Sequence, residues 1–120
     1  MRRLRSLKVT DAFRTFVLDQ LDGLDEVVPR AMFGGVGLYC RGVFFGILAS
    51  DVLYLKVDDT NRRDYERAGM TAFTPFPDRP GSMSYLSVPL DVLENASELT
   101  EWARKSVDVA RRAEGRRARR

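Results

Sequence analysis

The stretch Arg30–Asp59 reads RAMFGGVGLYCRGVFFGILASDVLYLKVDD, and it decides the fold class of this chain. Aromatic and β-branched residues fill it, and the dipeptides Arg41-Gly42 and Ser50-Asp51 interrupt it. Apolar runs that are separated by turn residues are typical of strands joined by tight turns. The stretch therefore predicts an antiparallel meander of three strands, at residues 35–40, 43–50 and 52–57.

The last of these strands predicts a sheet with one buried face. Its side chains alternate, with Leu53, Leu55 and Val57 on one side and Tyr54 and Lys56 on the other. The middle strand is apolar on both sides. Simple alternation places Phe44 and Leu48 on one face of the sheet and Phe45 and Ile47 on the other. We therefore expect a central strand that is at least partly covered on both faces.

Helix signals flank the meander. A first helix is predicted at 10–22, with Thr10 as N-cap and Gly23 as stop, and Pro29 should then break the chain. After the meander we expect a helix capped by Asp58 or Asp59 that ends near Ala68, strands at 73–76 and 83–88, and a helical turn at 89–93. The last helix begins after Asn95, which forms a capping box with Glu98, and it ends near Ala113. Trp102, Phe13 and Leu55 are predicted to join the terminal helices to the sheet.

This order, α-βββ-α-ββ-α, predicts an α+β fold, a two-layer sandwich with a five-stranded antiparallel sheet. The 120 residues suffice for one domain. We expect that domain at 10–113, after a basic N-terminal extension at 1–9 and before a basic, disordered tail at 114–120. The net charge of +3 combines +4 over 1–8 and +5 over 111–120 with −6 over 9–110. The basic charge therefore belongs to the ends of the chain.

Several motifs resemble the signature of the TfoX (Sxy) N-terminal domain family of bacterial competence regulators. They are Arg30–Tyr39, Phe45–Leu48, Asp51–Asp59, Ala68–Met70, Met83–Tyr85, Val88–Pro89 and Glu101–Ala103. The resemblance covers about residues 10–112 and implies the same order of elements, in a fold shared with type III secretion chaperones and the YjbR group. Full regulators of the family carry a second, C-terminal domain. The chain ends before one could begin, so we expect competence regulation not to transfer whole.

The composition disfavours an enzyme. The chain has no histidine and one cysteine, Cys40, which removes histidine-based catalytic triads and thiolate zinc sites. The glycines of Gly34–Gly37 do not form a phosphate loop, because neither G-K-[S/T] nor a third glycine opening a helix follows. Asp58 and Asp59 are better explained by helix capping than by acid–base catalysis. We expect no catalytic residue, metal or cofactor, and an inert Cys40.

The sheet offers a candidate binding face. Aromatic and cationic side chains are expected to share it: Arg30, Tyr39, Arg41, Tyr54, Lys56 and Tyr85. Such a face can stack bases or bind an anionic ligand or a protein partner. Two alternatives stay open: a buried salt bridge of Arg30 or Lys56 with Asp58, or a dimer interface that contains these residues.

The basic C-terminal block is a candidate for weak nucleic-acid contact. It contains Arg111, Arg112, Arg116, Arg117, Arg119 and Arg120. Runs of like charge are more often solvated tails, and the acidic body argues against a nucleic-acid platform on the fold itself.

Three function classes follow: a regulatory protein-interaction module, a ligand-binding domain and, disfavoured, an enzyme. The lone cysteine and the absence of a signal peptide or membrane span lead us to expect a cytoplasmic protein. Three helices are too few to cover both faces of the sheet, so Phe44 or Phe45 and Leu48 should lie near solvent. We expect a homodimer or a groove for a hydrophobic partner to cover them.

Overall fold

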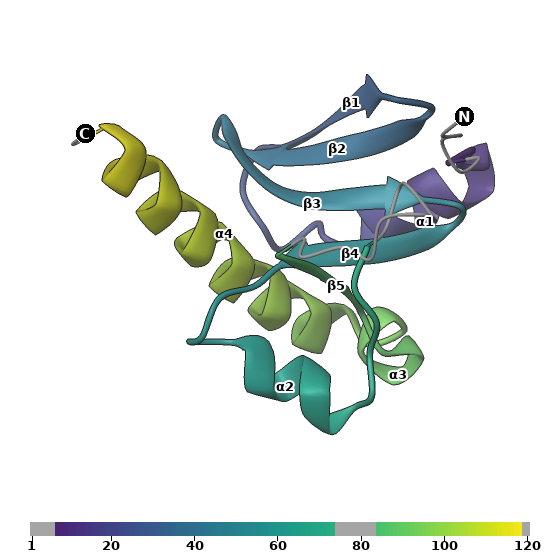
Figure 1. The fold of residues 1–120 in the computed structure, drawn as a ribbon. Helices are drawn as coiled ribbons and strands as arrows, with labels where there is room; N and C mark the ends of the chain where they lie inside the picture. Colours follow the sequence, from purple (N-terminus) through teal and green to yellow (C-terminus); the bar gives the residue numbers. More distant parts are fainter. Residues whose placement is uncertain (1–6, 74–83, 119–120) are drawn as a thin grey trace, which may run out of the picture.

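Five antiparallel strands form one sheet in the order β1-β2-β3-β4-β5 (Figure 1). In a computed structural model of the chain, residues 7–73 and 84–118 are described. The strands are β1 (Val27–Met32), β2 (Gly35–Cys40), β3 (Val43–Ala49), β4 (Val52–Lys56) and β5 (Tyr85–Ser87). The helices are α1 (Asp11–Gln20), α2 (Arg62–Arg67), α3 (Leu90–Leu93) and α4 (Ala96–Ala118). The predicted α+β fold with a five-stranded antiparallel sheet is confirmed.

The first strand of the sheet was not predicted, because Pro29 was expected to break the chain. Pro29 instead lies inside β1, opposite Leu38. The amide of Arg41 donates to the carbonyl of Glu26, so Glu26 and Arg41 are a hydrogen-bonded pair. Hydrogen-bonded and non-hydrogen-bonded pairs alternate along antiparallel strands, which makes Pro29 and Leu38 a non-hydrogen-bonded pair. Since β1 is an edge strand, the missing N–H of proline leaves no ladder bond unmade.

The predicted strand at 73–76 falls largely outside the described residues, which resume at 84. Within them, Ala72 forms an isolated bridge to Leu86 on the outer side of β5. Phe73 also donates its amide to the carbonyl of Tyr85. This short segment therefore covers the β5 edge, whereas no described residue pairs with the outer side of β1, which we call the open edge.

Three two-residue turns join the first four strands. In each turn both residues have positive φ: Phe33 (49°) and Gly34 (85°), Arg41 (50°) and Gly42 (81°), and Ser50 (52°) and Asp51 (56°). This pattern defines the type I′ hairpin, whose twist matches that of the strands. The two turns predicted from Arg41-Gly42 and Ser50-Asp51 are confirmed, and Phe33-Gly34 is a third.

A β-bulge in β3 decides which aromatic side chain enters the core. Tyr39 pairs with Phe44 and Leu38 with Gly46, so Phe45 is an extra residue without a partner in β2. The bulge shifts the alternation, which places Phe45 with the fully buried Leu48 rather than with Ile47. The predicted face assignments of Phe44 and Leu48, and the prediction that Leu48 lies near solvent, are therefore wrong.

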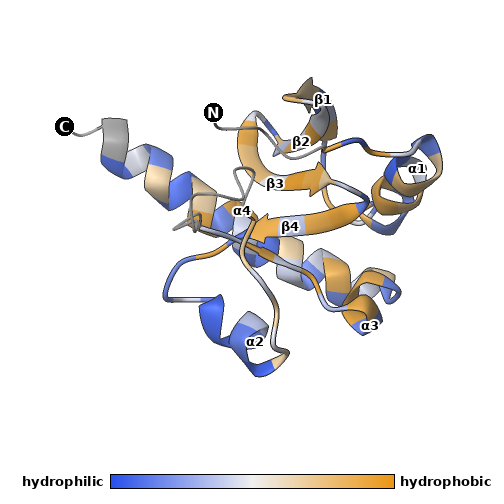
Figure 2. Cartoon of the chain, turned by 45° about the vertical axis from the view of Figure 1, so that its right-hand side comes forward, coloured by the Kyte–Doolittle hydropathy of each residue, from blue (hydrophilic) through white to orange (hydrophobic). Residues whose placement is uncertain are grey.

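The main core lies between one face of the sheet and the helices α1 and α4. Val17 of α1, Leu21 directly after it, and Leu99, Ala103 and Val107 of α4 pack against residues of the sheet: Leu38, Phe45, Leu53, Leu55 and Val57. Leu55 is fully buried, whereas Phe13 and Trp102 are partly buried against this cluster. Figure 2 shows β3 and β4 as hydrophobic along most of their length and α2 as largely hydrophilic. No helix among the described residues is long and apolar enough to cross a bilayer.

Side-chain caps begin α1 and α4. The hydroxyl of Thr10 accepts from the amide of Phe13, and the side chain of Asn95 accepts from the amide of Glu98, as predicted. The amide of Asn95 donates to the carbonyl of Val92, so the predicted capping box is formed only in this half. However, α2 begins after Asn61, so neither Asp58 nor Asp59 is its N-cap. The last helix continues to Ala118, five residues beyond the predicted end at Ala113.

Candidate functional site

Aromatic rings line the sheet face opposite α1 and α4. The ring of Tyr39 stacks on Phe44 with 5.1 Å between centroids, and Phe44 lies 5.6 Å from Tyr85. Beside this row, Tyr54 meets Phe73 at 5.1 Å. Tyr39 and Phe44 are cross-strand partners on β2 and β3, whereas the contact of Phe44 with Tyr85 reaches across β4 and that of Tyr54 with Phe73 reaches across β5.

Two cations complete the row at its ends. The guanidinium of Arg30 lies 5.4 Å from the ring centroid of Tyr39, and the ammonium of Lys56 lies 5.0 Å from that of Tyr85. Both distances are in the range of cation–π attraction. Arg30, Tyr39, Tyr54, Lys56 and Tyr85 therefore share one face, as the sequence predicted.

Arg41, the sixth predicted residue, does not join them. It occupies the β2–β3 turn, where its side chain forms exposed ion pairs with Asp25 at 2.9 Å and Glu26 at 3.2 Å. Phe44 links the two halves of the row; the sequence left open whether Phe44 or Phe45 lies on this face, and the structure places Phe44 there. Only the bulge at Phe45 turns Phe44 toward Tyr39, and no residue pattern indicated that bulge.

Gly37 keeps the centre of this face flat. A Cβ atom at Gly37 would lie 2.8 Å from the sulfur of Met32 and 3.1 Å and 3.3 Å from the rings of Phe44 and Tyr39. The glycine therefore allows the rings and the Met32 side chain to meet over the backbone of β2.

The covering of this face is uneven. On the β4–β5 side, Leu7 and Phe73 pack with Ile47, Ala49 and Tyr85 into a small second core. On the β1 side, Val28 is 46% exposed, Arg30 is exposed, and Tyr39 and Phe44 are half-buried. We call the residues Val28, Arg30, Met32, Tyr39 and Phe44 the open face. It combines apolar, aromatic and cationic groups, which is the composition of protein-binding surfaces.

A hollow lies at one end of the open face. It has a volume of about 210 Å³ and is lined by Phe44, Lys56, Tyr85, Ala110, Ala113 and Glu114. Sheet and helix both contribute, because α4 runs past the end of the strands here (Figure 1). Two aromatic rings and two alanines make the hollow suited to an apolar or aromatic group.

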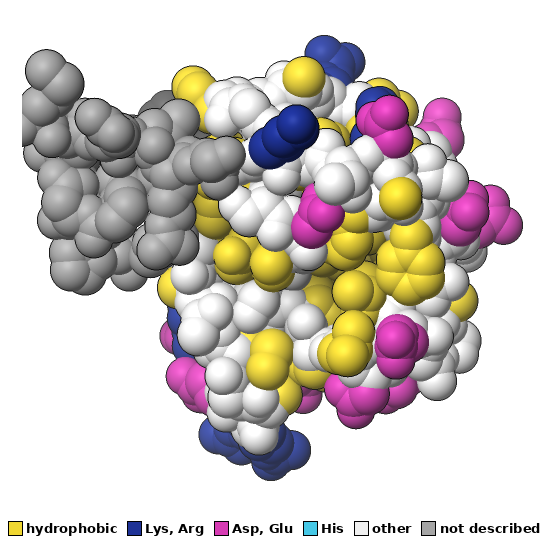
Figure 3. All heavy atoms as spheres, turned by 90° about the vertical axis from the view of Figure 1, so that its right-hand side faces the viewer, with side chains coloured by type: hydrophobic (Ala, Val, Ile, Leu, Met, Phe, Trp, Pro, Cys, Tyr) yellow, Lys and Arg dark blue, Asp and Glu magenta, His cyan; other side chains and the backbone are white. Residues whose placement is uncertain are grey.

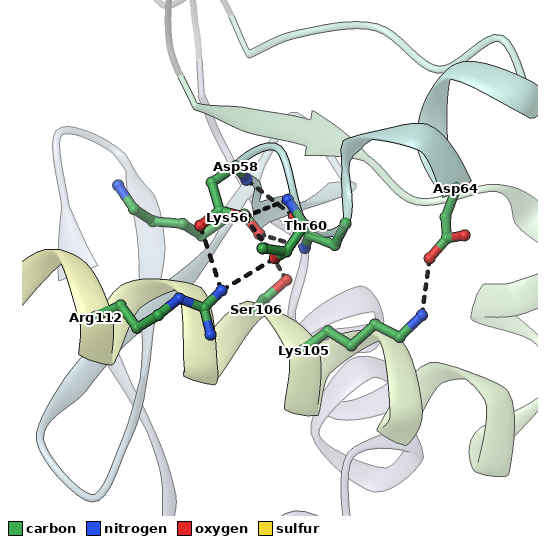
Figure 4. Close-up of polar contacts among 8 residues, drawn as sticks. Lys56, Asp58, Thr60, Asp64, Lys105, Ser106 and Arg112 are labelled. Carbon is green, nitrogen blue, oxygen red and sulfur yellow. Dashed lines mark hydrogen bonds and ion pairs between the residues drawn. The ribbon is translucent and has the colours of Figure 1, made fainter.

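A polar network fixes α4 against the end of β4 (Figure 4). The backbone carbonyl of Lys56 accepts from the Ser106 hydroxyl at 2.8 Å and from the Asn61 side chain at 3.1 Å. Asp58 accepts from the amide and hydroxyl of Thr60, and Arg112 reaches the Asp58 carboxylate at 3.3 Å. The partner of Asp58 is thus Arg112, not Arg30 or Lys56, the two partners considered from the sequence.

The pKa of Asp58 is lowered. Desolvation acts to raise the pKa of this carboxyl, but the hydrogen bonds from Thr60 and Arg112 and the charge of Arg112 outweigh it. A depressed folded-state pKa adds stability above the unfolded value of about 3.9, and that stability is lost as the pH falls through the folded pKa.

Asp58→Asn should therefore lower the free energy of unfolding at pH 7 by about 1 kcal/mol, because it weakens charge-assisted bonds. The difference from the parent should shrink as the pH falls from 7 to 3, because the unfolded parent chain then takes up a proton at Asp58 more readily than the folded chain does. Urea unfolding at the two pH values measures this. Asp59→Asn, at the exposed neighbouring carboxyl, should change little at either pH, and a difference that persists unchanged at low pH would contradict the assignment.

The arginines of the basic block are partly engaged in the fold. Arg111 lies 3.7 Å from Asp108, and Arg112 contacts Asp58 and Thr60. Both belong to α4, as does the exposed Arg116. The backbone of Arg117 also belongs to α4. Arg119 and Arg120 lie outside the described residues. A depression of about 520 Å³ runs along this stretch, lined by Asp108, Arg111, Arg112, Gly115 and Arg116.

Any affinity for nucleic acid should depend on the end of this helix. Deleting residues 114–120 removes four arginines and should abolish binding to a short DNA duplex at low salt. The melting temperature should stay unchanged, because the main core ends at Ala110. Fluorescence anisotropy at fixed salt measures the binding. Full affinity in the truncated chain would place the contact on the folded body instead.

Cys40 lies in the core-facing part of β2. It is 4% exposed and its thiol donates to the carbonyl of Asp25. Burial raises the pKa of this thiol, although the charges of Arg111 and Arg41 act in the opposite direction. Among the described residues, no three histidine, cysteine, aspartate or glutamate side chains gather in a way that could hold a metal ion.

A second apolar surface lies on the side of α1 and α3. Phe16 of α1 is 39% exposed and Leu90 of α3 is 66% exposed. Figure 3, which faces this side, shows a patch of hydrophobic side chains with Asp and Glu side chains around it. The side chain of Gln20 donates to the carbonyl of Leu93 and ties the two helices together beneath it.

The model of the TfoX N-terminal domain family matches residues 19–110, about three quarters of the chain. The chain therefore belongs to this family. No curated protein matches the chain. The matched region contains all five strands, the open face and most of α4.

Proposed function

We propose that this TfoX N-terminal domain is a non-enzymatic regulatory module that binds a protein partner through the open face of its sheet. The observation that carries the proposal is the composition of that face. A cation–π pair and two stacked rings lie there beside an exposed apolar side chain. Aromatic and arginine side chains are the groups that most often dominate protein–protein binding energy.

The chemistry of the chain supports binding rather than catalysis. Catalytic bases in enzymes are most often histidines, and the sequence has none. The single thiol is buried with a raised pKa, which lowers the fraction of reactive thiolate. We place the module in the bacterial cytoplasm and, from its family, in transcriptional control of the competence type.

The main alternative is an anionic small molecule held by Arg30, Lys56 and the tyrosines. The structure favours a protein, because the two cations lie at opposite ends of the aromatic row and not around one pocket. A ligand with separated negative charges would be needed to engage both.

In-cell photo-crosslinking tests the proposal. A photoreactive phenylalanine analogue replaces Tyr39 on the open face in one variant and the exposed Glu66 of α2 in a matched control. We expect discrete protein adducts from position 39 and none in common with position 66. Native mass spectrometry of the unmodified chain identifies any co-purified small molecule. A stoichiometric small-molecule adduct without protein adducts at position 39 would overturn the proposal.

A further inference from the structure

The β1–β2 turn contains a strained and exposed aromatic residue. Phe33 has φ of 49° and is 77% exposed. Bulky residues are uncommon at positive φ, and this turn type favours Asn-Gly. An exposed ring gains little from burial within its own fold. The turn therefore carries conformational strain that a smaller polar residue would relieve.

The other two hairpin turns use their side chains within the fold. Arg41 pairs with Asp25 and Glu26, and Asp51 accepts from the amide and the hydroxyl of Thr10 at 2.8 Å and 2.9 Å. The side chain of Phe33, in contrast, stacks on no aromatic ring among the described residues. Backbone strain at a residue without an ion pair or a ring contact among the described residues is typical of residues kept for a contact outside the fold.

The same molecule contains a site suited to an aromatic ring. The hollow described above is lined by Phe44, Tyr85, Ala110, Ala113 and Glu114, and by Lys56, whose ammonium lies over the ring of Tyr85. The β1–β2 turn and this part of α4 lie at opposite ends of the sheet (Figure 1). A two-fold axis across the middle of the open face would bring each turn to the hollow of the other copy.

We propose that two copies of the chain associate through their open faces, and that Phe33 of each copy enters the hollow of the other. The inference rests on the proposed function, since it takes a second copy as the partner of the open face. A closed, isologous pair results, because turn and hollow belong to the same surface.

Two further features favour face-to-face contact over extension of the sheet. Pro29 lies at a position whose backbone nitrogen points to the open edge, so the middle of that edge lacks a donor for a new strand. The hollow also offers an anionic group to Arg30, which lies on the strand that leads into the Phe33 turn: Glu114 lines the hollow, beside the cation Lys56.

Sedimentation equilibrium of the full chain and of two matched variants tests the inference. Phe33→Asn and Arg41→Asn both create Asn-Gly in the same turn type, but only the first removes the proposed anchor. We expect Phe33→Asn to weaken self-association at least tenfold and Arg41→Asn to leave it within about twofold. In dilute samples, where the protein is monomeric, Phe33→Asn should also raise the melting temperature by about 3–6 °C.

A change in the hollow should act on the same contact. Ala113→Leu fills the hollow from a half-exposed position on α4 and should weaken self-association as Phe33→Asn does. The double variant should lose little more than either single variant, because the two changes remove one shared contact.

The outcomes separate the inference from the proposed function. A chain that stays monomeric at all concentrations, or that dimerises equally with Phe33→Asn and Arg41→Asn, would overturn the role of Phe33. Adducts of another protein at position 39 would in that case still support an interaction module. If Phe33→Asn weakened self-association but left the melting temperature unchanged, the result would support Phe33 as the anchor and contradict the strain assigned to the turn.

Discussion

Phe45→Ala should be among the most destabilising single substitutions in this chain. Phe45 is fully buried where the bulge in β3 turns it under α4, and it lies in the main core. Truncating such a ring removes its transfer free energy and leaves a cavity, so we expect a loss of about 3–5 kcal/mol. Urea unfolding of the purified variant measures it.

Phe44→Ala is the matched control, because it removes the same side chain from the next residue on the opposite face. Phe44 is half-buried, so its loss should cost clearly less than that of Phe45. Equal costs, or a larger cost at Phe44, would mean that the bulge does not direct Phe45 into the core.

Gly35→Ala should give the second large effect. A Cβ atom at Gly35 would lie 2.6 Å from the backbone carbonyl oxygen of Leu48 and 3.5 Å from Leu7. The backbone of the central strand cannot move aside cheaply, so we expect a loss of about 2–3 kcal/mol from overpacking.

Gly23→Ala serves as its control. The nearest atom to a Cβ there is the hydroxyl oxygen of Thr100, a side-chain atom, at 3.3 Å. We expect a change within about 1 kcal/mol, since a side chain adjusts more easily than a strand. Thermal unfolding of both variants decides the matter, and a tolerated Gly35→Ala would show that β2 and β3 do not approach as closely as described.

Local sequence signals were sufficient for the centre of the sheet. The alternation of Leu53 and Leu55 with Tyr54, and the turn residues Arg41-Gly42 and Ser50-Asp51, predicted β3 and β4 with their connections correctly. The caps at Thr10 and Asn95 were also predicted, because each depends on residues only three positions apart.

The misses depend on contacts distant in sequence. Whether Pro29 breaks a strand depends on its place at the sheet edge, which the neighbouring residues do not specify. The bulge at Phe45 is likewise decided by packing under the helices, since alternation alone favours a regular strand. The end of α4 was placed too early, near Ala113, because the helix continues through Gly115, and a single glycine costs a helix only about 1 kcal/mol.

The candidate site divides in the same way. Alternation placed Tyr54 and Lys56 correctly, and pairing of the three predicted strands brought Tyr39 to them; Arg30 reaches the same face through β1, which was not predicted. Arg41 was misplaced because a residue in a type I′ turn leaves the alternation of the strands. Phe33 was missed because the turn that strains it exists only if β1 pairs with β2, and β1 itself was not predicted.

Radical footprinting of the assembled and the dilute, monomeric chain tests most directly whether the open face is the contact surface. We expect the oxidation of Phe33, Tyr39 and Phe44 to fall on assembly. Phe16 and Leu90, exposed on the side of α1 and α3, should react equally in both states. Protection of Phe16 and Leu90 with unchanged reactivity at Tyr39 would contradict the account and move the contact to the helical side.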